Sequence, residues 1–575
     1  MMKNKCKEMK KSRLLQLGLM VVLPLFMACN NDSDVEMDAM ESVEFKVEFA
    51  DFNAKQEIGV TRNGNQEVKI EEKVVDLGNN ILALVSLQRD TTRTVSPAAT
   101  RTVDDDTYTM LAYDHETHEF KGETVGKVEQ AKFVVTGKRL RLGAGKYDFV
   151  LFNSKVKRQG DRLIVPREHA LTAFIGRVTQ EIDASSGRKY VALNLKRVGA
   201  KVQMRLETYV PFENITAELK PVDDESVHDN SVYDAATGLL QPGTCATFKS
   251  PLTFKYGERG YVNDYYSNSK EIVSLLDATD VSKLKLVFKS GKPFGTDIDG
   301  LEYQFKPSAG LKIEANGYYV LKVKMFYNFF YLMADGGIGR TGETVQCGGT
   351  RTPIAVVLSR SKRIAMALYY AQVENYMWCD YKYMFTHHGN NYASTHTLVE
   401  EKGDRIYDGI WGHLVTKGID ETWDASYSTV KVKGNKVKAE NADFYAIYGA
   451  AHYDPKVEYK GANPLKWFLP SASDFIYVFN LGRGDKSSEN KSGKFDRFIE
   501  YNCNGALVSS ACTQVGGDRM IGPTYWTSSA LDPLFDIIYN DVKYAAISVS
   551  LEEDKFTWSY TCYQFSAVSR PFVSY

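Results

Sequence analysis

The residue with the clearest chemical role is Cys29, a cysteine that directly follows a short apolar run and a small residue. Residues 14–27 are mostly apolar, and six lysines and arginines precede them, which is the order of a secretory signal peptide. The apolar run is too short to cross a bilayer comfortably. The thiol of Cys29, next to Ala28, therefore stands where an exported chain can be cleaved and lipidated.

We accordingly predict a signal peptide over residues 1–28 and lipidation at Cys29. The Ala28-Cys29 step resembles the cleavage box of bacterial lipoproteins, and the alternative is an ordinary signal peptide with an incidental cysteine. Residues 29–42 are polar and acidic, so we expect a flexible tether. This segment resembles the acidic stretch of lipoproteins that are exported to the outer surface of Gram-negative cells. That resemblance implies anchorage in the outer membrane through lipid.

Charge and length narrow the class of protein. The whole chain has a formal net charge of −1, and removal of the basic signal peptide leaves a more acidic chain. Without a basic excess to neutralise phosphates, nucleic acid is not expected as a partner. The length that remains predicts about three domains.

Few residues are arranged for catalysis or metal binding. The sequence has no G-x-S-x-G, Walker loop or H-E-x-x-H motif, so we expect no enzyme activity. It also has no C-x-x-C pair of the kind that holds structural zinc. His387 and His388 are adjacent, and adjacent side chains on an extended chain point to opposite faces. We therefore expect no metal site and no cofactor.

The first two thirds of the chain predict β-structure. Residues 43–49 alternate apolar and charged side chains, as in a half-buried strand. Similar strands are predicted over residues 81–87, 108–113, 147–152, 191–195, 202–206 and 321–325. Short strands separated by glycine-rich turns are typical of β-sandwiches, and we place one over residues 43–188 and a second over 189–335.

The last part of the chain has a different composition. All six tryptophans lie at position 378 or later, which marks a separate domain over residues 336–575. Helical spacing of apolar residues predicts helices within residues 359–372, after Pro470 and within 495–501. Strands are predicted over residues 545–551 and 572–575. The predicted fold class is therefore mainly β, with an α+β C-terminal domain.

Aromatic residues are concentrated between positions 369 and 427, many of them in predicted loops. Exposed tyrosine and tryptophan rings suit sugars or protein partners. The alternative is that these rings pack the long-loop region. Our candidate ligand-binding residues are Trp378, Trp411, Trp423 and Tyr427. Among the cysteines, Cys503 and Cys512 are the closest pair in the later sequence and form a candidate disulfide in an exported chain.

Three segments resemble the fimbrillin-type pilins, which are the subunits of lipoprotein-derived (type V) pili. They are residues 108–114 with 120–123, residues 142–150 and residues 195–202, and the likeness extends roughly over residues 43–335. The resemblance implies two transthyretin-like β-sandwich pilin domains. It also implies other pilus subunits as partners.

The C-terminal region resembles a second group, the proteins with a C-type-lectin-like domain. The likeness rests on residues 467–471, 516–517, 525–529 and 569–572, in that order. It lacks the Glu-Pro-Asn and Trp-Asn-Asp triplets of calcium-dependent lectins, so it does not imply calcium. A pilin-like N-terminal part followed by a lectin-like C-terminal part resembles a pilus tip adhesin, whose ligand would be a host or bacterial glycan or protein.

The pilin resemblance implies proteolytic assembly. Precursors of this family lose their first strand when a protease cleaves after an arginine, and the open groove accepts a strand from the next subunit. Residues 43–49 would be the strand that is removed. Arg62 lies in a turn-forming sequence and is our candidate cleavage site, while Arg89, Arg93 and Arg101 are alternatives.

The predicted C-terminal strand belongs to the lectin-like domain, so the chain would accept a strand without donating one. The leading hypothesis is thus a fimbrial tip subunit that mediates adhesion. The alternatives are a non-polymerising surface lipoprotein that binds glycans or proteins, and an enzyme on the lectin-like fold.

Overall fold

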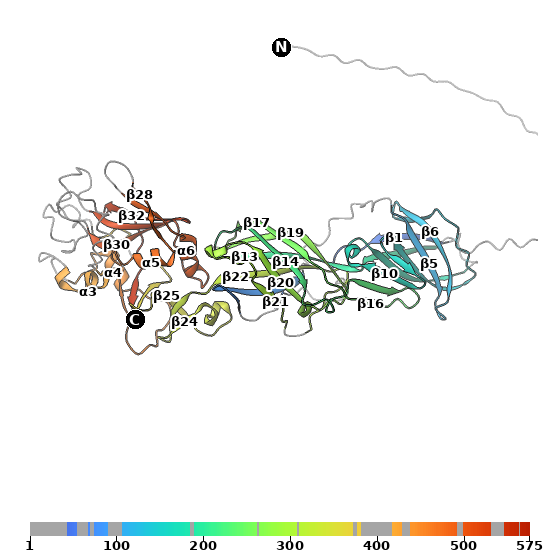
Figure 1. Cartoon of the computed structure of the whole chain (residues 1–575), viewed down its shortest axis with the longest axis horizontal. Helices are drawn as coiled ribbons and strands as arrows, with labels where there is room; N and C mark the ends of the chain where they lie inside the picture. Colours follow the sequence, from blue (N-terminus) through green and yellow to red (C-terminus); the bar gives the residue numbers. More distant parts are fainter. Residues whose placement is uncertain are drawn as a thin grey trace, which may run out of the picture.

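The protein is described by a computed structural model that covers residues 43–53, 67–69, 74–89, 106–183, 189–261, 264–307, 310–371, 376–380, 417–427, 437–491, 498–530, 545–562 and 564–575. Strands make up 49% and helices 12% of the structure, which confirms the predicted mainly-β class. The molecule is elongated, with three units in a row that we call the first, middle and C-terminal units (Figure 1). Within the described residues, no helix is both long and apolar enough to span a bilayer.

The first unit is built on a closed barrel with a dense apolar interior. Inward side chains from alternate strand positions, such as Met110, Phe149 and Leu193, are fully buried there. In order around the barrel, the strands are β1 (Val43–Phe49), β12 (Lys189–Arg197), β11 (Phe174–Ile182), β8 (Gly145–Asn153), β5 (Tyr108–Asp114), β6 (Phe120–Glu129) and β7 (Lys132–Val135).

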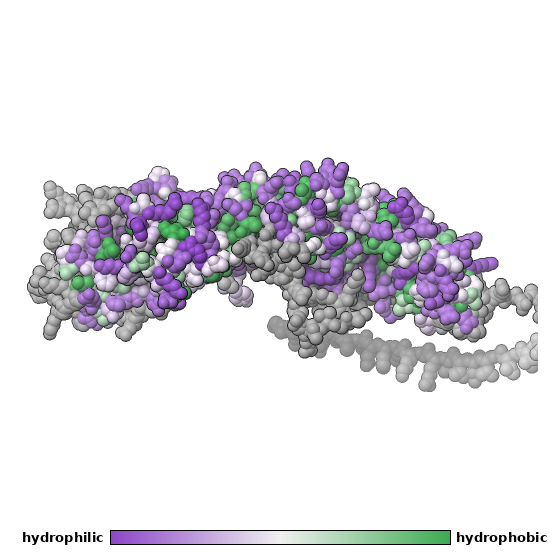
Figure 2. All heavy atoms as spheres, turned by 90° about the horizontal axis from the view of Figure 1, so that it is seen from below, coloured by the Kyte–Doolittle hydropathy of each residue, from purple (hydrophilic) through white to green (hydrophobic). Residues whose placement is uncertain are grey.

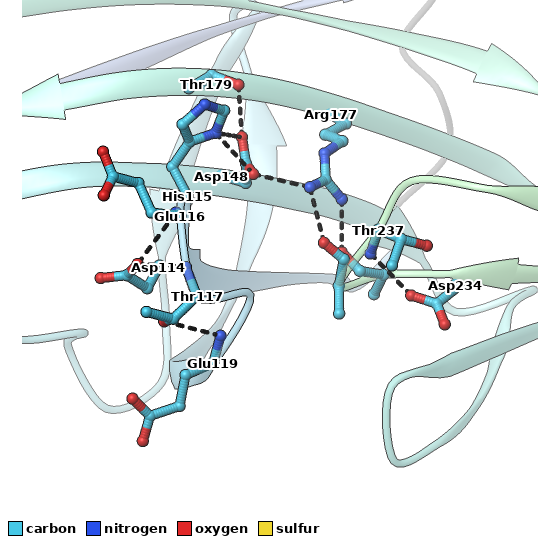
Figure 3. A network of polar contacts seen from close by, with 12 residues as sticks. Asp114, His115, Glu116, Thr117, Glu119, Asp148, Arg177, Thr179, Asp234 and Thr237 are labelled. Atoms are coloured by element: carbon cyan, nitrogen blue, oxygen red, sulfur yellow. Dashed lines mark hydrogen bonds and ion pairs between the residues drawn. The ribbon is translucent and has the colours of Figure 1, made fainter.

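A four-stranded sheet packs against the outside of this barrel through a second apolar cluster that contains Leu111, Val150 and Leu163. Its strands, in order, are β16 (Leu240–Pro242), β15 (Asn230–Asp234), β10 (Arg162–Pro166) and β9 (Lys157–Gln159). A polar network joins the two layers (Figure 3). Arg177 donates to Asp148 at 2.8 Å and also to the backbone carbonyls of Ala235 and Ala236, just beyond β15.

The middle unit is a sandwich of two sheets around a large shared core. The first sheet has the order β18 (Glu258–Arg259), β19 (Tyr265–Leu276), β13 (Gly199–Thr208), β22 (Tyr318–Tyr327), β4 (Ile81–Arg89) and β2 (Glu67–Lys69), with β3 (Val75–Gly78) also on β4. The second sheet has the order β17 (Ser250–Tyr256), β14 (Glu213–Pro221), β20 (Leu284–Ser290) and β21 (Glu302–Gln304).

The first and middle units exchange segments of chain. Strands β2 to β4 precede β5 in sequence but lie in the middle unit, whereas β12, β15 and β16 lie in the first unit. Sheet membership therefore does not follow the predicted boundary between residues 188 and 189. The physical reason is pairing over long sequence distances, because β1 pairs in parallel with β12 and β4 pairs with β22.

The C-terminal unit contains two sheets and four α-helices among its described residues. The first sheet has the order β24 (Ile338–Arg340), β23 (Phe330–Met333), β25 (Pro353–Ser359), β26 (Ile364–Ala367), β33 (Phe572–Ser574) and β27 (Lys466–Phe468). The second has the order β28 (Asp485–Lys491), β29 (Phe498–Asn502), β32 (Lys555–Cys562), β31 (Ala545–Leu551) and β30 (Thr524–Ala530). The helices are α3 (Gly418–Trp423), α4 (Tyr445–Ala451), α5 (Ile476–Leu481) and α6 (Gly505–Thr513).

Two of the predicted helices are wrong. Residues 359–372 contain β26 and the end of β25, because both strands find paired neighbours in the sheet. The residues around Phe498 form β29, which pairs with β32 along its length. The helix predicted after Pro470 is present as α5, and the strands predicted over 545–551 and 572–575 are present as β31 and β33.

The middle and C-terminal units share one continuous apolar core, which includes Leu321 on one side and Phe475 on the other. Gln514 is buried at their junction. Its side-chain oxygen accepts from the Tyr327 N–H at 3.2 Å, and its amide nitrogen donates to the Tyr327 carbonyl, the Tyr331 hydroxyl and the Thr341 hydroxyl. The two units are thus joined both by apolar packing and by the hydrogen bonds of one buried amide.

Candidate functional site: the groove that holds β1

Strand β1 fills a groove in the first unit with apolar side chains. Phe45 and Val47 point inward and are only 3% and 1% exposed. The ring of Phe45 lies edge-on to Phe149 at 4.9 Å between centroids, and Phe49 lies 5.2 Å from Phe174. Burying each such side chain is worth about 1.5–3 kcal/mol. The groove therefore recognises alternate large apolar residues on an extended chain.

The backbone of β1 is held unequally on its two sides. On one side it pairs in parallel with β12, from Val43 opposite Lys189 to Phe49 opposite Leu195. On the other side its ladder with β7 has a single residue pair, Lys46 with Lys132. The barrel thus closes through a thin seam, and departure of β1 would leave β12 with an unpaired edge.

The tight turn between β6 and β7 contributes to that seam. Gln130 and Ala131 both have positive φ values, 50° and 61°, which is the backbone of a hairpin turn that usually takes Asn-Gly. This turn presents the Ala131 carbonyl to the Val47 N–H at 2.8 Å. An ion pair between Glu44 and Lys132 adds to the same edge. The seam therefore depends on a strained turn and one ion pair between a half-buried glutamate and an exposed lysine.

The structure separates the arginines that were considered for cleavage. Arg89 ends β4, where its backbone pairs with Tyr319. Its guanidinium donates to Asn53 and pairs with Glu314 at 2.6 Å. A residue fixed in this way in a sheet is a poor protease site, because cleavage needs an accessible, extended segment. Arg62, Arg93 and Arg101 lie outside the described residues, as does Cys29.

The predicted aromatic ligand site is partly wrong. Trp378 is fully buried and donates its indole N–H to the Thr527 carbonyl at 2.8 Å, so its ring is part of the core and cannot contact a ligand. Trp423 is half-buried, with its indole N–H on the Trp467 carbonyl at 2.8 Å. Tyr427 is also half-buried, just after α3. Trp411 lies outside the described residues.

The predicted disulfide between Cys503 and Cys512 is also wrong. Both are buried free thiols. Cys503 precedes α6, whereas Cys512 lies in its last turn, and the length of helix between them keeps the two sulfurs apart. Burial raises the pKa of Cys503 to about 12 and also raises that of Cys512. Thiols of this kind are poor nucleophiles.

Two further observations bear on ligands. Among the residues that the structure describes, no group of three or more His, Cys, Asp or Glu side chains is placed to hold a metal ion. One face of the molecule is mostly hydrophilic, with hydrophobic residues in small scattered patches (Figure 2). Scattered exposed apolar residues are normal for a protein surface and do not define a binding site.

Comparison with known proteins gives structural neighbours only. No family model and no curated protein matches the chain. A fimbrial protein from Bacteroides ovatus is similar over 82% of this chain and 94% of its own, with 12% identity and a TM-score of 0.23. A protein of Bacteroides uniformis described as a "putative cell adhesion protein" covers 38% of this chain and 86% of its own, with 11% identity and a TM-score of 0.25.

A third neighbour, from Bacteroides thetaiotaomicron, is described among "putative polysaccharide binding proteins". It covers 32% of this chain and 67% of its own, with 13% identity and a TM-score of 0.19. At these identities and TM-scores we infer neither family membership nor function from the neighbours.

Proposed function

We propose that this protein is a fimbrial tip subunit that is exported as a surface lipoprotein, assembled by β-strand addition and used for adhesion. The observation that carries the proposal is the placement of β1. This strand supplies apolar side chains to the first unit but is held on one side by only a thin seam. Its removal would leave an apolar groove beside an unpaired strand edge, which is the geometry that an incoming strand requires.

The strand order supports Arg62 as the processing site. Cleavage there would release β1 alone, because β2 begins at Glu67. Cleavage at Arg89, Arg93 or Arg101 would also place β4 on the released fragment. Strand β4 pairs with β22 from Ile81 to Arg89 and buries four side chains in the middle core, so its loss would destroy that unit. Only a cut before β2 leaves the middle unit complete.

The C-terminal strand supports a terminal position in a fibre. Strand β33 lies between β26 and β27, and both Phe572 and Val573 are fully buried. Withdrawing it to pair with another subunit would open the C-terminal unit. In this proposal β33 stays in its own sheet while the first unit accepts a strand, so the proposed place of the chain is the end of a fibre.

In this proposal the C-terminal unit is the adhesive part, and its partner is a host or bacterial glycan or protein. Trp411, Trp423 and Tyr427 remain the candidate contacts, because Trp378 is a core residue. A glycan array that compares the wild type with Trp411→Ala and Trp423→Ala tests this part. Trp378→Ala is not an informative variant, since it would empty a core position. Unchanged binding by both variants would remove the aromatic contacts from the proposal.

The processing step has a direct test. The purified precursor is treated with an arginine-specific protease, and the new N-terminus is sequenced before the product is mixed with a fimbrillin-type stalk pilin. We expect a product that starts at Asn63 and associates with the pilin. Arg62→Ala should block both results, whereas Arg93→Ala and Arg101→Ala serve as matched controls that should change neither.

Two outcomes would contradict the proposal. A trimmed protein that stays monomeric with every co-encoded pilin would favour the alternative of a surface lipoprotein that never polymerises, with Cys29 as its permanent anchor. Cleavage that proceeds normally in Arg62→Ala would move the processing site elsewhere.

A further inference from the structure

The residues that follow β1 occupy a pocket where the first and middle units meet. We call it the waist pocket, and it is formed by Arg89, Phe174, Arg197, Asn316 and Tyr318. Phe174 and Arg197 belong to strands of the first barrel, whereas the other three belong to the middle unit. The segment that fills it, residues 50–53, would leave together with β1 after processing at Arg62.

Phe52 supplies the aromatic part of this contact. The guanidinium of Arg197 lies 4.3 Å from the centre of the Phe52 ring and 4.8 Å from that of Phe174, so it stacks against both rings. The ring of Tyr318 lies 6.3 Å away on the side of the middle unit. A cation between aromatic faces is a favourable arrangement that becomes stronger as water is excluded. The pocket therefore selects a flat aromatic side chain.

Asn53 supplies the polar part. Its side-chain oxygen accepts from the Tyr318 N–H at 3.0 Å and from Arg89 Nε at 2.8 Å, and its own N–H donates to the Asn316 carbonyl at 2.9 Å. The φ value of Asn53 is 66°, a left-handed conformation that asparagine adopts more readily than most residues. The pocket thus selects an amide side chain at a turn.

The backbone of the segment is bound as well. Arg197 donates to the Ala50 carbonyl at 2.9 Å, and the side chain of Asn316 donates to the Asp51 carbonyl at 2.6 Å. Asn316 is only 4% exposed. When residues 50–53 leave, the buried Asn316 amide and the Tyr318 N–H lose these hydrogen bonds, which costs free energy unless another segment replaces them.

We propose that the waist pocket is a second recognition site for the donor strand, beyond the groove itself. This inference rests on the proposed function. The partner it fits is an extended segment of another subunit with inward apolar residues at alternate positions. An aromatic residue and an asparagine follow the last of these, three and four positions further on, as Phe52 and Asn53 follow Phe49. Because the pocket contains residues of both units, its occupant also fixes how the two units meet.

The test uses the full-length chain with a unique protease site inserted between Asn53 and Glu67. After cleavage and release of the N-terminal segment in mild denaturant, fluorescently labelled synthetic peptides are added back and their affinities are measured by anisotropy. The peptides comprise residues 43–53, residues 43–49, and the longer peptide with Phe52→Ala, Asn53→Ala or Asp51→Ala. The last is a matched control, because the pocket contacts only the backbone carbonyl of Asp51.

We expect residues 43–53 to bind at least tenfold more tightly than residues 43–49. Phe52→Ala and Asn53→Ala should each lose most of that gain, whereas Asp51→Ala should keep it. On the protein side, Asn316→Ala should weaken the longer peptide without changing the affinity for the shorter one.

The outcomes separate the two proposals. Equal affinity for the short and long peptides, with both bound, would overturn the waist pocket as a recognition site and leave strand addition intact. No binding of either peptide to the trimmed protein would overturn the proposed function and this inference with it.

Discussion

Asp148 shows how single residues hold the first unit together. Burial opposes ionisation of this carboxyl, but hydrogen bonds from Thr179 and His115 and the charge of Arg177 outweigh it, so its pKa lies below the ordinary value. Its side chain is 2% exposed. The carboxylate orients Arg177, which in turn holds the carbonyls beyond β15 (Figure 3).

Replacing this carboxylate should weaken the first unit in a pH-dependent way. We expect Asp148→Asn to lower the free energy of unfolding by about 2 kcal/mol near neutral pH, because buried partners lose a charged acceptor. A carboxyl whose folded pKa is lowered stabilises the fold above its unfolded pKa, and this contribution is lost as the pH falls through the folded value. The difference between wild type and variant should therefore shrink below about pH 4.

Thermal unfolding across a pH series measures this effect. Glu116→Gln is the matched control, since Glu116 is an exposed carboxylate in the same unit and should show no such dependence. A constant difference between Asp148→Asn and wild type from neutral to acid pH would contradict the prediction.

The sequence shows where the aromatic residues lie along the chain, but it does not show which of them are buried. The late position of all six tryptophans predicts a separate domain, yet nothing local separates Trp378 in the core from the half-buried Trp423. The waist pocket was missed for a similar reason. Its residues come from four distant stretches of chain, and the only local sign was the turn-forming asparagine at position 53.

At the scale of elements, β33 turns the end of the chain into part of a sheet. Val573 is opposite Ala365 on one side and Trp467 on the other, so three distant segments meet at one position. This strand was predicted from the sequence as residues 572–575. The neighbouring strand β26 was not predicted, because Ile364 and Leu368 have helical spacing. Residues 364–367 form a strand because their backbone pairs with β25 on one side and with β33 on the other.

Truncating the buried side chain of β33 should destabilise the C-terminal unit selectively. We expect Val573→Ala to lower its free energy of unfolding by about 2 kcal/mol, through lost burial and a residual cavity. Tryptophan fluorescence during chemical denaturation is a specific readout, because all six tryptophans lie at position 378 or later. Ser574→Ala changes an exposed neighbour and should shift the midpoint little. Equal midpoints for the two variants would contradict the prediction.

At the scale of the molecule, the middle and C-terminal units share one apolar core, whereas the first unit has apolar clusters of its own and meets the middle unit at the waist pocket. Gln514 satisfies buried groups of Tyr327, Tyr331 and Thr341 at once. Arg483 adds contacts to the Gly295 carbonyl and the Thr296 hydroxyl. We therefore expect these two units to unfold together, and the first unit to unfold in a separate transition.

Removing the central amide should uncouple that shared transition. Gln514→Ala removes the hydrogen bonds of this amide to Tyr327, Tyr331 and Thr341 at a buried junction. We therefore expect the unfolding temperature detected by tryptophan fluorescence to fall by several degrees and to separate from the calorimetric transition of the middle unit. Gln346→Ala is the control, as it removes an exposed glutamine from the same unit. A single unshifted transition in Gln514→Ala would mean that the units are coupled by apolar packing alone.

The exchange of segments between the first and middle units could not be predicted from the sequence. The apolar run over residues 81–87 predicts a strand, but β4 finds its partner in β22, more than two hundred residues later. Pairing over such distances leaves no trace in local periodicity.

This exchange has an evolutionary consequence. A genetic crossover anywhere between β1 and β22 would join halves of sheets that were never selected together, so the first two units can be inherited only as a block. The sheets of the C-terminal unit, by contrast, come from one uninterrupted stretch that begins with β23 at Phe330. A crossover between β22 and β23 would transfer that unit whole. We expect recombination to replace the C-terminal unit while the first and middle units descend unchanged, provided the incoming unit completes the shared apolar core and carries a counterpart of Gln514.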